Sequence, residues 1–373
     1  MALPDVVTLF CDLAATPSPP GEERAVADQV AAYLDELGLE VSEDDAGAEL
    51  GATAGNLFAR LPPTDADGGT AIFLCAHLDT VPPTDAIEPV VEDGIVRNAR
   101  PTILGADNKA AVAAMLGGVR RVVEEGLPHA GVELVFTPKE ETGLEGAKAF
   151  DVSRLEARTG FVYDQEGPLG QLVIAAPWST AIDAVFLGRA AHAGIAPEDG
   201  RSAILTAARA IGDLRLGRVD EDSTANVGVI RGGSARNVVC DRCHIEAEAR
   251  SRDERKLAGL VREMVDSFAF AAAIGECEVE TMIEEKYRGY RFRPDDRVVQ
   301  LAAAALRRVG VEPRETLGGG GADANVFNER GLACLNLSHG VEHFHSPEEH
   351  VSVEDLERMV DVTVALVDVA RAA

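Results

Sequence analysis

Short, continuous apolar runs alternate with a helical stretch in the first part of the chain, and this alternation constrains the fold more than any other feature. The runs over 71–76, 132–136 and 160–163 are typical of strands buried in the middle of a sheet. An alanine-rich stretch over about 108–125 lies between the first two and predicts a helix that ends before Pro128. Strands that alternate with helices in this way indicate an α/β sheet covered by helices.

The pattern changes in the middle of the chain and then returns. Strands are expected over 180–187, within 225–250 and over 276–284, and helices over 201–212 and 253–270. From about residue 290 the α/β pattern resumes, and Ser352 is the expected N-cap of the last helix. The sequence therefore predicts an α/β domain formed by 1–177 and 290–373, interrupted by an inserted α+β domain of residues 178–289.

Charge and hydropathy bear on partners and location. The chain has 35 Lys and Arg against 63 Asp and Glu, a net charge of -28. A surface this negative repels phosphate backbones, so no nucleic-acid partner is expected, whereas a divalent cation would be attracted. No apolar run is long enough for a membrane span, and Asp5 and Asp12 interrupt the apolar amino-terminal stretch, which lacks a basic leader region. We expect a cytoplasmic protein with no membrane partner.

Histidine and carboxylate side chains lie at the ends of the predicted strands and loops of the α/β part. In open α/β sheets, binding sites lie beyond the carboxyl ends of the strands. His77 and Asp79 are two residues apart on an extended chain, so they point the same way and the carboxylate can orient the imidazole. Alone, Asp107 would be a helix cap and the other acids would be loop charges. Their equivalent positions favour a metal site, with the candidates His77, Asp79, Asp107, Glu140, Glu141 and Asp164.

These segments resemble the metal motifs of the M20 metallopeptidases, and the resemblance continues in the family's order from about residue 50 onwards. The matching segments are HLDTV at 77–81, GADNK at 105–109, KEETG at 139–143, YD at 163–164, AHAGIAPE at 191–198, GGSARN at 232–237, AEARS at 247–251, GGGADAN at 319–325 and HSPEEHV at 345–351. The middle segments are most similar to the peptidase T-like, tripeptide aminopeptidase-like branch. The resemblance implies a zinc-exopeptidase-type catalytic domain with a mixed sheet and helices on both faces. It also implies a ferredoxin-like inserted domain that serves as a lid and forms a homodimer.

The resemblance further implies a centre of two divalent ions. Asp107 would bridge them, with His77 and Asp164 on one ion and Glu141 and His345 on the other. Zinc suits this mixture of imidazole and carboxylate ligands, and cobalt or manganese would also fit. Family members have a cis bond at the position of Asp107 and the residue after it, here Asn108, and the sequence leaves its geometry open.

The carboxyl-terminal histidine ligand is ambiguous from spacing alone, because His339, His343, His345 and His350 lie close together. In the family pattern, a small residue follows the ligand and a glutamate stands four positions on. His345 fits this pattern with Ser346 and Glu349, and His343 is the next candidate.

Other roles also follow from the resemblance. Glu140 would be the general base, and Asp79 would orient His77. In the inserted domain, His192 would stabilise the tetrahedral oxyanion, often reaching in from the partner subunit. The expected substrate contacts are Arg250, which would bind a carboxylate, Asn237, and the backbone at Gly320.

The predicted function is cleavage of an amide bond in small peptides by a water held between two zinc ions. An exopeptidase of the peptidase T type is the first hypothesis. A deacylase of N-acyl-amino acids or a carboxypeptidase would use the same site, so the metal motifs do not separate them. A non-catalytic binding protein is the remaining alternative, although Glu140 and every expected ligand are present.

Overall fold

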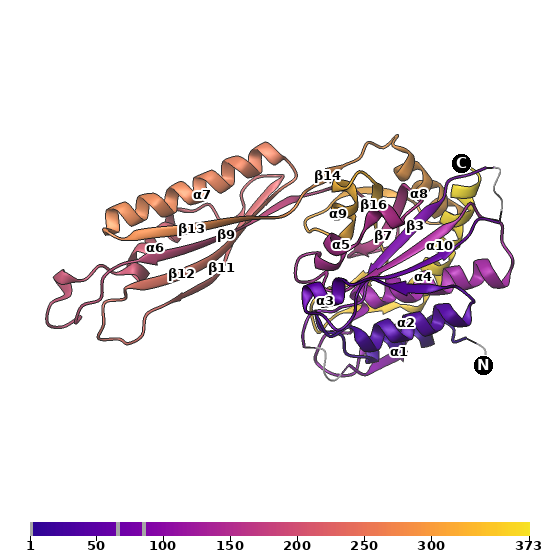
Figure 1. Cartoon of the computed structure of the whole chain (residues 1–373), viewed down its shortest axis with the longest axis horizontal. Coiled ribbons are helices and arrows are strands. Elements are labelled where there is room, and N and C mark those ends of the chain that lie inside the picture. Colours follow the sequence, from indigo (N-terminus) through magenta and orange to yellow (C-terminus); the bar gives the residue numbers. More distant parts are fainter. Residues whose placement is uncertain (1–2, 65–67, 84–86) are drawn as a thin grey trace. The chain divides into compact units, whose positions relative to one another are not determined.

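The computed structural model describes residues 3–64, 68–83 and 87–373, which form two compact units (Figure 1). Unit 1 contains the described residues up to Ala175 and from Arg291 onwards, and unit 2 contains Ala176–Tyr290. The chain therefore leaves unit 1, builds unit 2 and returns. That unit 2 acts as a lid or forms a dimer stays a prediction.

Among the described residues, nine strands form a mixed sheet that runs through unit 1. Its order is β1-β2-β6-β3-β7-β16-β8-β14, and β15 also pairs with β8. Strands β6, β3, β7 and β16 are parallel neighbours, and β2 and β8 flank them in the antiparallel sense. The strands are β1 (Val41–Glu43), β2 (Leu57–Leu61), β3 (Ile72–His77), β6 (Val132–Thr137), β7 (Thr159–Gln165), β8 (Gln171–Ala176), β14 (Tyr290–Arg291), β15 (Arg314–Leu317) and β16 (Ala333–Ser338).

Helices cover both faces of this sheet, as predicted (Figure 1). One face packs on α1 (Val6–Ala15), α2 (Arg24–Glu36), α4 (Ala106–Glu124), α8 (Arg297–Arg308) and α10 (Val353–Arg371). The other side carries the short helices α3 (Ala46–Leu50), α5 (Glu145–Ala149) and α9 (Asp323–Glu329) and a turn of 3₁₀ helix, Val152–Arg154. Side chains of a strand alternate between its two faces. Leu74 of β3 therefore joins the core with α4 and α10, while Phe73 packs on Phe327 of α9, with ring centroids 5.0 Å apart.

Gly160 of β7 leaves the space that the Phe73 ring occupies. A Cβ at residue 160 would lie 2.1 Å from the ring atom Cζ of Phe73, and Phe327 packs against the same ring. We expect Gly160→Ala to lower the free energy of unfolding by about 1–3 kcal/mol, because an overpacked core strains its neighbours. Urea unfolding measures this, with Gly68→Ala as control because a Cβ at Gly68 meets nothing within 4 Å. Equal midpoints for the two variants would contradict the prediction.

The polar Thr363 on the apolar face of α10 has a structural reason. Its hydroxyl donates to the main-chain oxygen of Met359 at 2.9 Å and lies 3.1 Å from the hydroxyl of buried Tyr163. Gly118 of α4 faces the same threonine, because a Cβ there would approach it to 2.4 Å. The glycine therefore allows the close contact of α4, the helix that begins next to Asp107, with α10.

Unit 2 has the ferredoxin-like arrangement. Its antiparallel sheet has the order β10-β11-β12-β9-β13, and the chain runs β-α-β-β-α-β with the fourth long strand next to the first. Both helices pack on one face, over Ile182, Phe186 and Ile245. The elements are β9 (Trp178–Leu187), α6 (Ala203–Asp213), β10 (Gly217–Arg218), β11 (Ser223–Gly232), β12 (Arg242–Ser251), α7 (Glu254–Gly275), β13 (Glu278–Tyr287) and a 3₁₀ turn, Pro197–Asp199.

A small sheet completes unit 1, with the order β17-β18-β5-β4. Its strands are β4 (Pro89–Glu92), β5 (Ile95–Asn98), β17 (Val341–Glu342) and β18 (His350–Ser352). The pairing of β18 with β5 brings the carboxyl-terminal histidine segment to the segment before α4. Within the described ranges, no helix is long and apolar enough to cross a membrane.

Candidate metal centre

His77 is the last residue of β3, and its ring is held by the residue that was expected to orient it. Nδ1 lies 2.9 Å from the main-chain oxygen of Asp79 and 3.4 Å from that residue's carboxylate. With Nδ1–H donating to Asp79, Nε2 is the ring nitrogen that remains for a ligand bond, and it lies 3.3 Å from Oδ1 of Asp107. His77 is therefore prepared to bind a cation through Nε2.

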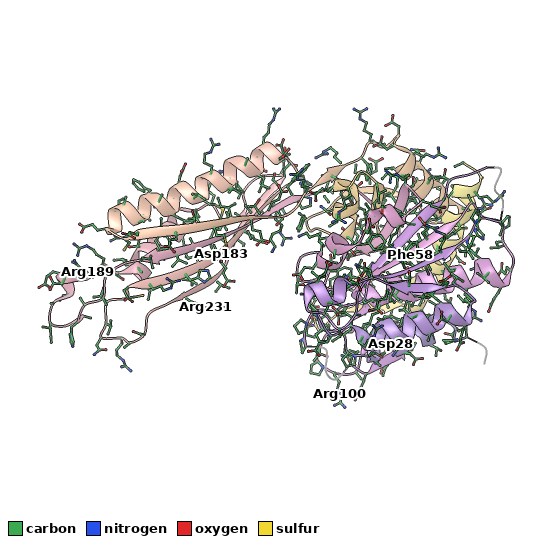
Figure 2. The ribbon with its side chains drawn as sticks, viewed as in Figure 1. Asp28, Phe58, Arg100, Asp183, Arg189 and Arg231 are labelled. Atoms are coloured by element: carbon green, nitrogen blue, oxygen red, sulfur yellow. The ribbon has the colours of Figure 1, made fainter. Side chains whose placement is uncertain are left out.

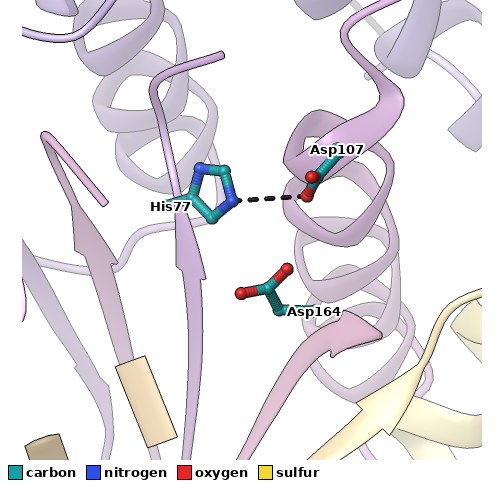
Figure 3. A group of neighbouring side chains, drawn as sticks. All are labelled: His77, Asp107 and Asp164. Atoms are coloured by element: carbon teal, nitrogen blue, oxygen red, sulfur yellow. Dashed lines mark ion pairs between the residues drawn. The ribbon is translucent and has the colours of Figure 1, made fainter. Parts of the chain in front are cut away.

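Asp107 and Asp164 complete a first group with His77. Figure 3 shows the three side chains meeting from the end of β3, the start of α4 and the end of β7. One ligand atom of each lies within 4.8 Å of the others. The backbone at Asp107 and Asn108 is not helical, and the bond between them is cis.

A second group contains Asp107, Glu141 and His345, whose ligand atoms also lie within 4.8 Å of one another. Nε2 of His345 is 3.1 Å from Oδ2 of Asp107 and 3.0 Å from Oε1 of Glu141. The two oxygens of Asp107 thus face different histidines, one from each group. A carboxylate shared in this way is suited to bridge two cations.

Glu140 lies beside both groups. It is 8% exposed, and its carboxylate is within 4.8 Å of ligand atoms of His77 and Glu141. The carboxylate of Asp79 accepts the main-chain N–H groups of Glu140 at 3.0 Å and of Glu141 at 3.1 Å. Asp79 therefore orients the loop of Glu140 and Glu141 as well as the ring of His77.

The negative charges of the buried carboxylates in this cluster favour the binding of cations. Burial raises the pKa of Glu140 well above its usual range, and the charge of Asp164 adds to this. Burial raises the pKa of Asp164 as well, and Asp107 adds to it. Oδ1 of Asp107 is buried without a hydrogen bond to any described residue. Four carboxylates, including Glu141, around two imidazoles would be neutralised by two divalent ions, so these residues fit such a pair.

Binding of a divalent ion should release protons, since His345 holds one in the ion-free protein. Hydrogen bonds to Asp107 and Glu141 raise the pKa of His345 to about 10. Near pH 7 the imidazole is protonated, and it must lose that proton to become a ligand. We expect Zn²⁺ affinity to rise between pH 6 and pH 9, with about one or more protons released per protein. Calorimetry in buffers of different ionisation enthalpy measures this, and a binding enthalpy that is the same in every buffer would contradict it.

The other histidines among the described residues belong to neither group. The ring of His343 lies beside that of His350, with ring centroids 5.6 Å apart. His339 is buried against Phe344, and burial lowers its pKa to about 4. His129 is buried, and Nε2 of His244 lies 2.9 Å from Oδ1 of Asp183 (labelled in Figure 2). Of the four carboxyl-terminal histidines, the structure brings His345 to the cluster.

The predicted substrate residues lie outside these groups. In unit 2, His192 and Asn237 are exposed and belong to adjacent loops, because the N–H of Ala193 donates to the main-chain oxygen of Asn237 at 3.0 Å. Arg250 is half-buried on β12 and binds Glu248 at 2.9 Å. Gly320 is exposed in the segment before α9. Their roles stay predictions.

Three buried side chains hold the ligand loops and carry little signal in the sequence. The amide of Asn336 binds the main chain of Asp164 twice, accepting from its N–H at 2.9 Å and donating to its oxygen at 2.7 Å. Oε1 of Glu23 accepts the N–H of Lys139, the residue before Glu140, at 3.1 Å. The third is Glu349, and its place four residues after His345 is the one sequence signal among the three.

Comparison with known proteins identifies similar chains. The sequence model of Peptidase family M20/M25/M40 matches residues 73–369, more than half of the chain. The uncharacterised protein YqjE of Bacillus subtilis (strain 168) is 38% identical, over 97% of each chain. Peptidase T of Escherichia fergusonii is 28% identical over 72% of this chain, and the match spans 66% of that protein's own length.

Two solved structures are similar over nearly the whole chain. The aminopeptidase PepT of Bacillus cereus ATCC 10987 is 38% identical, with a TM-score of 0.89 and 98% of each chain covered. A tripeptidase of Staphylococcus aureus (subsp. aureus Mu50) is 33% identical, with a TM-score of 0.94, covering 99% of this chain and 98% of that one. The similarity includes the segments that carry both residue groups.

Proposed function

Because the chain belongs to peptidase family M20/M25/M40 and is a metal-dependent hydrolase of amide bonds, we propose that it removes the first residue from small peptides, tripeptides above all. One observation carries the proposal: two groups of ligands share Asp107, and Glu140 stands beside both. Relatives named aminopeptidase and tripeptidase, 38% and 33% identical, favour this substrate class over acylated amino acids.

In the proposed centre, His77, Asp107 and Asp164 would hold one ion, and Asp107, Glu141 and His345 would hold the other. Two divalent ions, when bound, supply the Lewis acidity that activates water near neutral pH and polarises the scissile carbonyl. We propose zinc, with cobalt or manganese as alternatives, because imidazole and carboxylate ligands suit all three. Elemental analysis of protein purified without added metal identifies the ion.

Glu140 is the proposed general base. It accepts a proton from the attacking water and donates it to the nitrogen of the leaving amine. Its buried carboxylate has a pKa well above the usual range in the ion-free protein, and the hydrogen bond from its N–H to Asp79 fixes the loop. The position of Glu140 next to the two ligand groups supports this role.

His192, Asn237, Arg250 and Gly320 are proposed to bind the substrate. The adjacent loops of His192 and Asn237 would act together, with the imidazole donating to the oxyanion of the tetrahedral intermediate. If His192 has this role, His192→Ala lowers kcat and does not change the metal content of the protein.

A homodimer through unit 2 and a cytoplasmic location are further parts of the proposal. Within the described part of the chain, β13 is an edge strand that pairs with β9, and its Met282 and Ile283 are 62% and 52% exposed. Exposed apolar side chains on an edge strand are suited to bind another copy. The six cysteines are free, as in a reducing compartment. Light scattering tests the dimer, and a monomer at micromolar concentration would contradict it.

The function is tested on a panel of alanine- and leucine-containing tripeptides, dipeptides and N-acetyl amino acids. The metal-loaded protein should release the first residue of the peptides, and Glu140→Gln should not. Cleavage confined to acetylated amino acids would favour a deacylase, and release of the last residue a carboxypeptidase. No cleavage of any substrate with both ions bound would favour a binding protein.

A further inference from the structure

Glu349 is a buried carboxylate that binds the main chain around Asp107. It is 2% exposed and lies just before β18. Its Oε2 accepts the N–H groups of Leu104 at 2.7 Å and Gly105 at 2.8 Å, and its Oε1 accepts the N–H of Asp107 at 2.8 Å. Both oxygens are therefore turned to the main chain, so Glu349 is placed as a support of Asp107 and not as a further ligand.

The segment that Glu349 binds has no regular structure to hold it. Gly105 is in the left-handed region with φ of 72°, and Asp107 and Asn108 depart from helical geometry. N–H groups at such a helix start lack partners within the helix. A buried N–H without an acceptor costs about 1–3 kcal/mol. Glu349 supplies the acceptors for three of these donors at once.

The same loop also carries His345. His345 stands four residues before Glu349, and its backbone φ of 60° is in the left-handed region. Its Nε2 is 3.1 Å from Oδ2 of Asp107. Glu349 thus ties the main chain of Asp107 to the loop of His345, across 242 positions of sequence. The separation between these two side chains depends on this tie.

We propose that Glu349 is a positioning residue that sets the affinity for the ion held by Asp107, Glu141 and His345. It does so by fixing the Asp107 loop against the His345 loop. His77 and Asp164 belong to strands β3 and β7, which pair with each other, so the other group is built with less dependence on this tie. The proposal rests on the proposed function, in that it takes the two groups to be metal sites.

Glutamine is the most informative replacement for Glu349, because it keeps the shape of the side chain and removes one of its two acceptor oxygens. Its amide NH₂ would face at least one of the three main-chain N–H groups, and two donors cannot bind each other. Glu348→Gln is the matched control, since Glu348 is the exposed neighbour and its carboxylate is not one of these acceptors. Both variants replace a carboxylate with an amide of nearly the same shape, so they differ in which main-chain contacts are lost.

The test is a Zn²⁺ titration of the metal-free wild type, Glu349→Gln and Glu348→Gln proteins against a chromophoric chelator. We expect Glu349→Gln to bind one of its two ions about 10- to 100-fold more weakly, the usual effect of losing a residue that supports a ligand, and Glu348→Gln to match the wild type. Peptidase activity of Glu349→Gln should fall at limiting Zn²⁺ and recover as free Zn²⁺ rises. A general loss of folding would lower the thermal midpoint and would not be rescued by zinc.

Equal affinity of Glu349→Gln and wild type for both ions would overturn the proposal. If Glu349→Gln does not fold, Glu349→Asp replaces it, because the shorter side chain cannot reach all three N–H groups. Wild-type affinity for both ions in Glu349→Asp would also overturn the proposal. A wild type that binds two ions but cleaves no peptide would end the peptidase proposal and leave the Glu349 comparison valid. A wild type that binds fewer than two ions would overturn both.

Discussion

Glu140→Gln is expected to lower kcat/KM for a tripeptide by about 10²- to 10⁴-fold, the range that general acid–base catalysis contributes. Glutamine has nearly the same shape but cannot accept and return a proton. Glu140 is buried and lies within 4.8 Å of ligand atoms of His77 and Glu141, so it lies at the proposed metal site. Steady-state kinetics on the metal-loaded variant measures the loss.

Metal content distinguishes this effect from loss of the ions. Glu140→Gln should keep two ions, whereas the neighbouring change Glu141→Gln should weaken the ion next to His345, because Oε1 of Glu141 faces that ring at 3.0 Å. Adjacent residues with opposite results would assign one to proton transfer and the other to metal binding. A Glu140→Gln variant with normal kcat would remove Glu140 as the base.

Asp107→Asn is expected to have the other large effect, because its carboxylate is common to both groups. Its Oδ1 faces His77 at 3.3 Å and its Oδ2 faces His345 at 3.1 Å. An amide offers one neutral oxygen in place of two charged ones, so both ions should bind more weakly. We expect a loss of activity of about 10³-fold or more, beyond the 10- to 100-fold that the loss of a supporting residue costs.

Two single-site variants provide the comparison. Asp164→Asn and His345→Ala each alter one group, so each should still bind one ion tightly. Zinc content after dialysis separates the three variants, and circular dichroism verifies that they are folded. Two tightly bound ions in Asp107→Asn would contradict the bridging role.

The course of strands and helices in unit 1 could be predicted from local sequence. The runs at 71–76, 132–136 and 160–163 are apolar, apart from Glu133, because the strands β3, β6 and β7 are largely buried on both faces. The predicted mixed sheet with helices on both faces is confirmed. In unit 2, α7 is longer than the predicted 253–270 and ends at Gly275, since the alanines after residue 270 continue the helix and no residue before Gly275 stops it.

The candidates of the site were also visible in the sequence, because side chains at the ends of neighbouring parallel strands must meet. His77 and Asp164 end β3 and β7, which are adjacent. The choice of His345 among four histidines came from the pattern of its motif and not from spacing. The structure places it against Asp107 and Glu141, while its role as a ligand stays a prediction.

By itself, the sequence determined what is local: the period of each strand and helix, the order of the elements, and the chemistry at their ends. The tertiary structure alone decided how the loops that carry this chemistry are held. The amide of Asn336 binds the main chain of Asp164 from 172 positions away, and Glu349 binds that of Asp107 from 242 positions away. Any loop offers the same N–H and carbonyl groups whatever its side chains are, so a side chain that binds these groups across the fold leaves no pattern in the sequence.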